Sequence, residues 1–158
     1  KNRFPILARQ LQIPLRPFGF CHLAIHNKSE RTMWWTSQAF SEILFYQGTD
    51  GSVPFTNWLN SLPPAVRDQC IFTLDQLDEI GLVDYLPDAH YLRDGIHYLR
   101  IAHAGALYRM FYFELSHRVF VVSHGCVGGN IEWETEHAIL HRRKLIRSPG
   151  RHLCKPAS

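Results

Sequence analysis

The chain has 158 residues, of which 46% are hydrophobic and 20% are charged, a composition typical of globular rather than disordered proteins. This length suits one domain with a sizeable core. The formal net charge of +3 permits a nucleic-acid partner without establishing one. No apolar run approaches the roughly 18 residues of a membrane-spanning helix, so we expect no membrane partner.

The four cysteines lie far apart and form no C-x-x-C motif; they are Cys21, Cys70, Cys126 and Cys154. This spacing fits neither a disulfide framework nor a zinc ribbon, and it favours a reducing compartment. The N-terminal residues lack the apolar stretch of a secretory signal. The sequence therefore predicts a soluble, cytoplasmic protein.

Residues 1–32 contain several prolines and no sustained periodicity, so we expect a loosely ordered N-terminal extension or an artefact of the assigned start site. A short packed strand through Leu11 and Leu15 is the alternative. The compact domain is predicted at residues 33–147. Residues 148–158 are polar and contain prolines, which predicts a flexible C-terminal tail.

The first half of the domain predicts one strand and two helices. Residues 41–47 fit a strand, and Ser52 is placed to cap a short helix with proline in its first turn. A longer helix is predicted over residues 65–80, with Gly81 as the residue after its end. Apolar residues recur in it at helical spacing; they are Val66, Cys70, Leu74 and Leu77.

The second half predicts three consecutive antiparallel strands at residues 96–103, 107–115 and 118–124. A final helix follows at residues 131–144, capped by Asn130, with acidic residues first and basic residues last, as the helix dipole favours. The order β-α-α-β-β-β-α predicts a small α+β domain with helices packed on a mainly antiparallel four-stranded sheet.

Two arginines interrupt the apolar strands. If each hairpin closes in a two-residue turn, Arg100 lies opposite Arg109 and Arg109 lies opposite His124. These three residues would then form one row, on the face that also carries Tyr98 and Phe111. A bulge in either hairpin would break this alignment.

Such a row predicts a bound anion, because like charges opposed across strands are destabilising. Guanidinium groups bind phosphate in a bidentate manner, and histidine titrates near neutral pH. The hypothesis is RNA cleavage, in which a base takes the 2′-OH proton and Arg100 and Arg109 stabilise the phosphate charge. The alternative is that both arginines pair with Glu114, Asp94 or helix carboxylates.

Two segments carry a family resemblance: DGIHYLR at residues 94–100 and YRMFYF at residues 108–113. With the WL-x-x-L pattern at residues 58–62, they resemble the HigB-like branch of the RelE/ParE toxin superfamily. The resemblance covers residues 41–144. It implies a RelE-like fold in which Arg100 and Arg109 contact RNA phosphate.

The resemblance also implies an activity and partners. Relatives are toxins of type II toxin–antitoxin systems, and the RelE-like and HigB-like ones cleave mRNA on the ribosome without a metal. The expected partners are a helix-turn-helix antitoxin, the ribosome and mRNA. A catalytically silent member is the alternative, either a ParE-like inhibitor of gyrase or a degenerate protein that binds only its antitoxin.

One departure from the family pattern concerns charge. Where relatives usually have a lysine pair, this chain has Gly128-Gly129. His124 and three further arginines are candidates to compensate. The residues assigned to RNA binding are Tyr98, Arg118, Arg142 and Arg143.

The ten histidines raise the question of a metal site. His137 and His141 have the i,i+4 spacing of a ligand pair on a helix. No H-E-x-x-H motif is present and no third ligand is evident, and isolated spacing matches are often false. We therefore expect a solvated helix face, with no metal and no other cofactor.

Overall fold

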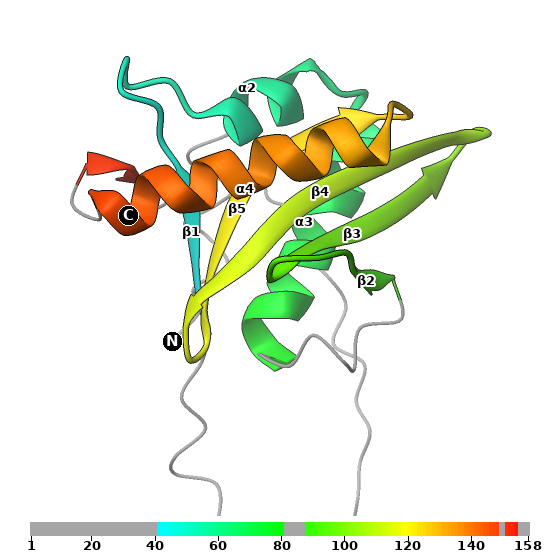
Figure 1. The fold of residues 1–158 in the computed structure, drawn as a ribbon. Helices are drawn as coiled ribbons and strands as arrows, with labels where there is room; N and C mark the ends of the chain where they lie inside the picture. Colours follow the sequence, from blue (N-terminus) through cyan, green and yellow to red (C-terminus); the bar gives the residue numbers. More distant parts are fainter. Residues whose placement is uncertain (1–40, 81–87, 149–150, 155–158) are drawn as a thin grey trace, which may run out of the picture.

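The computed structural model describes residues 41–80, 88–148 and 151–154, in which three helices pack on one six-stranded mixed sheet (Figure 1). The predicted N-terminal extension lies outside the described residues, as does Gly81. In chain order the elements are β1 Glu42–Tyr46, α2 Pro54–Ser61, α3 Pro64–Ile80, β2 Ala89–Tyr91, β3 Ile96–His103, β4 Ala106–Ser116, β5 Val119–Val127, α4 Ile131–Arg147 and β6 Leu153–Cys154.

The sheet order is β2-β3-β4-β5-β1-β6, and β1 runs parallel to β5 while the other neighbours are antiparallel. The α+β class and the order of the main elements are confirmed. The four predicted strands are flanked by two short ones, so the sheet has six strands. Strands of two or three residues are too short to produce an alternating pattern.

Part of the predicted flexible tail joins this sheet. Leu153 pairs with Tyr46 of β1. His152 is buried, and its Nδ1 lies 3.1 Å from the carbonyl oxygen of Gln47. Within the described residues 151–154, the tail therefore forms the edge of the sheet.

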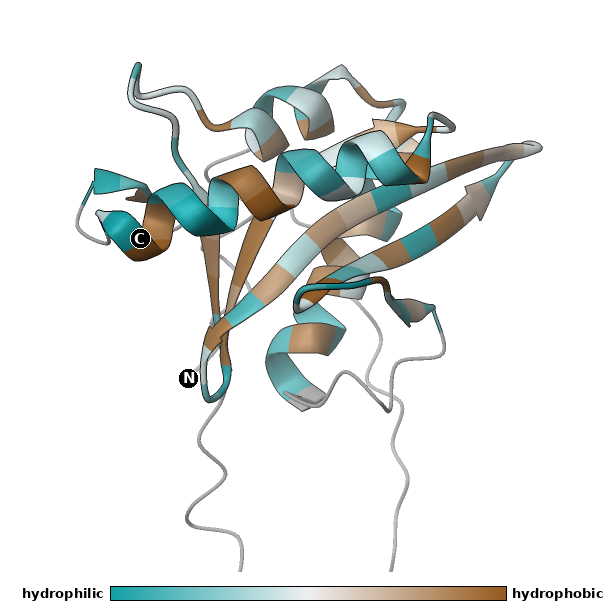
Figure 2. Ribbon diagram, in the orientation of Figure 1, coloured by the Kyte–Doolittle hydropathy of each residue, from teal (hydrophilic) through white to brown (hydrophobic). Residues whose placement is uncertain are grey.

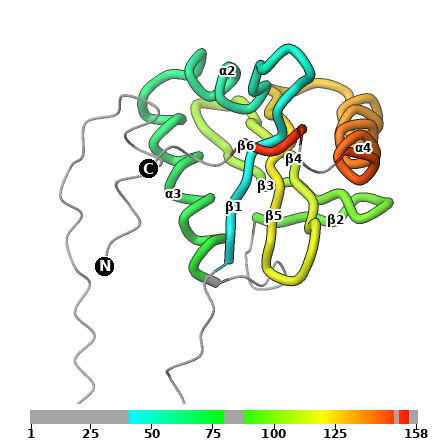
Figure 3. The backbone as a smooth tube through the Cα atoms, turned by 90° about the vertical axis from the view of Figure 1, so that its left-hand side faces the viewer, coloured from blue at the N-terminus to red at the C-terminus, as the bar shows by residue number. Residues whose placement is uncertain are grey.

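Helices cover both faces of the sheet: α2 and α3 lie on one side and α4 on the other (Figure 3). Strands β1 and β5, which are neighbours in the sheet, are largely hydrophobic, whereas α4 carries hydrophilic turns toward solvent (Figure 2). The two cores are separate because successive strand residues point to opposite faces. No helix in the described part of the chain is long and apolar enough to cross a membrane.

The helix starts differ in their caps. At α2 the prediction for Ser52 is wrong: Val53 is the cap residue and makes no side-chain cap bond, while the Ser52 hydroxyl donates to Asp50 at 2.7 Å. Pro54 supplies the first helical residue. At α4 the prediction is confirmed, because Asn130 Oδ1 accepts a bond from the backbone N–H of Glu132 at 2.9 Å.

The Asn130 cap leads to a test. Asn130→Ala should lower the free energy of unfolding by about 1 kcal/mol, because one N–H of the first turn loses its acceptor. Urea denaturation measures this change. Asn57→Ala, on an exposed position of α2, is the control and should leave stability unchanged within about 0.5 kcal/mol. Equal stability of the two variants would show that the cap contributes nothing.

The β3–β4 hairpin has the predicted register. It turns on Ala104 and Gly105, both with positive φ, and Arg100 lies directly opposite Arg109. This part of the alignment is confirmed because a two-residue turn fixes which residues face each other.

The β4–β5 hairpin does not have the predicted register. Its last pair is Ser116 with Val119, one residue later than predicted, and the shifts of the two irregularities that follow cancel. Arg109 therefore lies opposite Cys126, and His124 lies opposite Phe111. The single row of Arg100, Arg109 and His124 is therefore wrong. The irregularity between Phe111 and Tyr112 leaves Ser123 without a partner in the ladder, as at a β-bulge.

Candidate functional site

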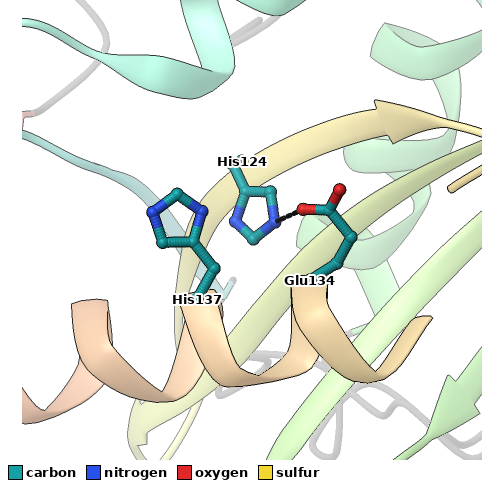
Figure 4. Close-up of side chains that lie close together, drawn as sticks. All are labelled: His124, Glu134 and His137. Carbon is teal, nitrogen blue, oxygen red and sulfur yellow. Dashed lines mark hydrogen bonds and ion pairs between the residues drawn. The ribbon is translucent and has the colours of Figure 1, made fainter. Parts of the chain in front are cut away.

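A group of polar side chains lies between β5 and α4. His124 comes from β5, and Glu134 and His137 come from the first half of α4 (Figure 4). His141 lies one turn after His137 on the same helix. These residues are brought together because α4 packs across the sheet on the face to which His124 points.

Hydrogen bonds connect four side chains in one row: His141, Ser123 of β5, His124 and Glu134. The Ser123 hydroxyl lies 2.8 Å from Nδ1 of His141 and 2.8 Å from Nδ1 of His124. His124 Nε2 lies 3.0 Å from Glu134 Oε2. Because a hydroxyl has one proton, Ser123 donates to one histidine and accepts from the other. The hydrogen bonds of the row can therefore all be donated in the direction from His141 to Glu134, or all in the opposite direction.

Burial sets the charge of this row. It lowers the pKa of His124 to about 4 and that of His141 to about 3, with the charge on His137 adding to both effects. Burial also raises the pKa of Glu134. The adjacent carboxylate favours a charged imidazole, but burial of the pair opposes it. At neutral pH the imidazole of His124 is therefore neutral and its Nε2–H donates to Glu134.

The i,i+4 histidine pair does not lie wholly on a solvated helix face, and the prediction is wrong for His141. His141 is buried, and its ring stacks on Tyr46 with centroids 3.8 Å apart. His137 lies nearer the surface, and its ring centroid lies 5.2 Å from that of His124. His137 thus contacts both His124 of β5 and the exposed ring of Trp133.

Arg109 lies on the same sheet face as His124, two residue pairs further along the β4–β5 ladder. Its Nη1 donates to the carbonyl oxygen of Gly128 at 2.7 Å, and its guanidinium carbon lies 5.9 Å from the centroid of the Tyr98 ring. Its Nε is buried without a hydrogen-bond partner among the described residues. No ion pair links Arg109 to a carboxylate in this part of the chain. The guanidinium therefore keeps donor capacity for an anion.

Arg100 is more exposed and has a carboxylate nearby. Its Nη2 lies 3.6 Å from Asp88 Oδ1, and both side chains are about half exposed, at 46% and 52%. An exposed pair of this kind contributes about 0–1 kcal/mol, so a phosphate could displace it. The partners that the sequence suggested are occupied elsewhere: Asp94 lies 3.6 Å from Arg93, and Glu114 accepts the backbone N–H of Arg118.

Two glycines, Gly128 and Gly129, shape the loop between β5 and α4. Gly128 and Gly129 have φ values of 63° and 82°, a region that other residues adopt only with strain. This conformation directs the Gly128 carbonyl oxygen to Arg109. A Cβ on Gly129 would lie 3.6 Å from Glu134 Oε1. The loop thus lies between Arg109 and the carboxylate of Glu134.

The other predicted RNA contacts lie in different places. Arg118 is in the β4–β5 turn. Strand β4 runs for seven residues, or about 23 Å, from Arg109 to its end at Ser116, so Arg118 lies far from Arg109. Arg142 donates to the carbonyl oxygen of Asp94 at 3.3 Å, beside the β2–β3 turn. Arg143 is exposed on α4. Of the four residues, only Tyr98 is brought next to Arg109.

Sequence reasoning missed Ser123 and Glu134. Glu134 and His137 have an i,i+3 spacing, which places them on the same side of a helix and could have been noticed. Ser123 had no signal, because it meets both histidines only through the irregularity in β5.

Comparison with known proteins identifies the family. A scan against family models matches residues 57–144 to the family described as phage derived protein Gp49-like (DUF891). A search of the curated proteins finds no match. The matched segment runs from the middle of α2 to near the end of α4, covers more than half of the chain and includes the whole site. This protein therefore belongs to the Gp49-like family of phage derived proteins.

Proposed function

We propose that this protein is the toxin of a type II toxin–antitoxin pair and that it cleaves mRNA on the ribosome. The observation that carries the proposal is the arginine pair: Arg100 and Arg109 lie directly opposite each other on β3 and β4, beside Tyr98. Membership of the Gp49-like family, which is associated with RelE-like toxins, supports the same class.

Phosphate is the ligand that best fits this pair. Opposed like charges cost stability unless an anion compensates them, and guanidinium groups bind phosphate oxygens in pairs. Arg109 has donors without carboxylate partners, and the contact of Arg100 with Asp88 is exposed and weak. The ring of Tyr98 lies next to them, with the Arg109 guanidinium over it, and aromatic side chains are common contacts of RNA bases.

The proton acceptor in this proposal is the pair His124 and Glu134. The 2′-OH loses its proton to this pair, the 2′-oxygen forms a bond to phosphorus, and the bond to the 5′-oxygen breaks. The products are a 2′,3′-cyclic phosphate and a 5′-hydroxyl end, which takes up a proton. Arg109 and Arg100 stabilise the charge on phosphorus oxygens, and burial of Glu134 keeps its pKa above the ordinary value.

The partners follow from the activity. We propose that the ribosome presents the mRNA, that Arg142 and Arg143 on α4 and Arg118 in the β4–β5 turn add contacts to RNA, and that a helix-turn-helix antitoxin keeps the toxin inactive. Arg143 is exposed, and the Arg142 side chain reaches the edge of the sheet at Asp94.

Induced expression in a bacterium tests the proposal. The wild type should arrest growth and produce new mRNA 5′ ends within translated regions. Arg109→Ala should lower the cleavage rate by about 100-fold, because the phosphate charge loses its principal donor. Arg147→Ala removes one exposed charge at the end of α4 and is the control, expected to cleave at the wild-type rate. Mapping mRNA ends by sequencing measures both.

A protein-binding function is the second candidate. His124 is buried, and a carbonyl oxygen already occupies one nitrogen of Arg109, features that favour a catalytically silent module. Growth arrest without new mRNA ends would support an inhibitor of a protein target, of the ParE-like kind. The absence of arrest would support a degenerate member that binds only its antitoxin.

A further inference from the structure

We propose that His124, Glu134 and His137 form a binding site for a divalent transition-metal ion of the Zn²⁺ type. One ligand atom from each of the three residues lies within 4.8 Å of the other two, and His124 Nε2 lies 3.0 Å from Glu134 Oε2 (Figure 4). Two imidazoles and one carboxylate are a ligand set that such ions use in proteins.

The backbone supplies the three side chains from two elements. Glu134 and His137 are three residues apart on α4 and lie on the side facing the sheet. The Asn130 cap fixes where this helix begins. The irregularity in β5 brings His124 against them. An ion at this point would link helix and sheet, so its binding would stabilise the fold.

The surroundings of His124 suit metal ligation. A ligating imidazole uses one nitrogen for the ion and usually donates its other N–H to an oxygen, which fixes its orientation. His124 Nδ1 lies 2.8 Å from the Ser123 hydroxyl, which can pass its own proton to Nδ1 of His141. In this arrangement the lone pair of His124 Nε2 points toward Glu134 and is available to bind the ion. The two hydrogen bonds of Ser123 therefore remain when the ion binds, and the ion replaces the bond between His124 and Glu134.

The distances require a modest adjustment. Ligand bonds of about 2.0–2.2 Å in a tetrahedral site place neighbouring donor atoms about 3.4 Å apart. The pair His124 and Glu134 is already near this separation. The ring of His137, which lies at the surface and contacts exposed Trp133, would move closer by about an ångström. Three protein ligands leave a fourth position for water.

The ligand types also predict selectivity. Mg²⁺ and Ca²⁺ prefer sites made of oxygen atoms, whereas imidazole nitrogen favours Zn²⁺ and related ions. The site differs from the pair His137 and His141 that the sequence suggested, because Nδ1 of His141 is bonded to Ser123. Zn²⁺ at this site would occupy His124 and Glu134, the pair proposed to accept the 2′-OH proton, so metal binding should compete with RNA cleavage and can be measured without it.

The test measures Zn²⁺ binding to the full chain at pH 7.5 by calorimetry, with Mg²⁺ as the comparison ion. We expect one Zn²⁺ per chain with a dissociation constant in the micromolar range or tighter, a raised melting temperature with Zn²⁺, and no effect of Mg²⁺. Glu134→Gln and His137→Ala should each weaken binding at least about tenfold. Glutamine keeps a hydrogen-bond acceptor near His124 but loses the negative charge of the ligand.

Two further variants distinguish this site from other histidines of the chain. His117→Ala, at an exposed turn position, should bind Zn²⁺ as the wild type does. Ser123→Ala removes the bond that orients His124 and should weaken binding about tenfold without removing a ligand. The proposal is overturned if Zn²⁺ does not bind, or if Glu134→Gln and His137→Ala bind it with wild-type affinity.

Discussion

Gly125→Ala should lower the free energy of unfolding by at least about 3 kcal/mol, because the new methyl group overlaps a rigid aromatic ring. A Cβ at Gly125 would lie 2.2–2.4 Å from three ring carbons of Trp58. Trp58 belongs to α2 and packs against the core on the α2 and α3 face. Neither the strand nor the ring can move away without disturbing this core. Urea denaturation of the two proteins measures the difference.

A double-mutant cycle checks the cause. Trp58→Leu removes the ring and should itself cost stability through lost packing. If the ring is the obstacle, Gly125→Ala should cost far less in the Trp58→Leu background than in the wild type. Gly128→Ala is the matched control: it meets no atom within 4 Å but has a positive φ, so it should cost only about 1 kcal/mol. An equal cost at both glycines would contradict the steric explanation.

Asp75→Asn should stabilise the protein by up to about 4 kcal/mol at pH 8 and should have little effect at pH 4. Burial raises the pKa of Asp75 to about 7, and the nearby charges of Asp78 and Glu79 add to this. The folded state therefore binds the Asp75 proton more tightly than the unfolded chain. The stabilisation it gives is complete below pH 4 and is lost as the pH rises toward 7. Asparagine carries no charge and avoids this loss.

The measurement compares unfolding free energies of variant and wild type at several pH values between 4 and 8. The variant is compared with the wild type at each pH because buried His124 and His141 also change charge in the acid range and affect both proteins equally. Asp68→Asn, on an exposed position of the same helix α3, is the control and should change stability equally little at every pH. A stabilisation by Asp75→Asn that did not grow with pH would contradict the assignment.

Local patterns were sufficient for much of the fold. The apolar spacing of α3, with Val66, Cys70, Leu74 and Leu77 all buried, follows from helical periodicity. The cap at Asn130 follows from side-chain chemistry within three residues. The pairing of Arg100 with Arg109 follows from a two-residue turn. Each of these depends only on neighbours along the chain.

The site depended on contacts that no local pattern encodes. The β4–β5 turn lies one residue later than predicted, which moves His124 out of the arginine row, and an irregularity in β5 turns Ser123 and His124 toward α4. Glu134 joins His124 only because α4 crosses the sheet there. The sequence by itself thus determined the α+β class, the main elements and the arginine pair. The tertiary structure alone decided the edge strands β2 and β6 and the grouping of His124, Glu134 and His137, because these arise between segments distant in the chain.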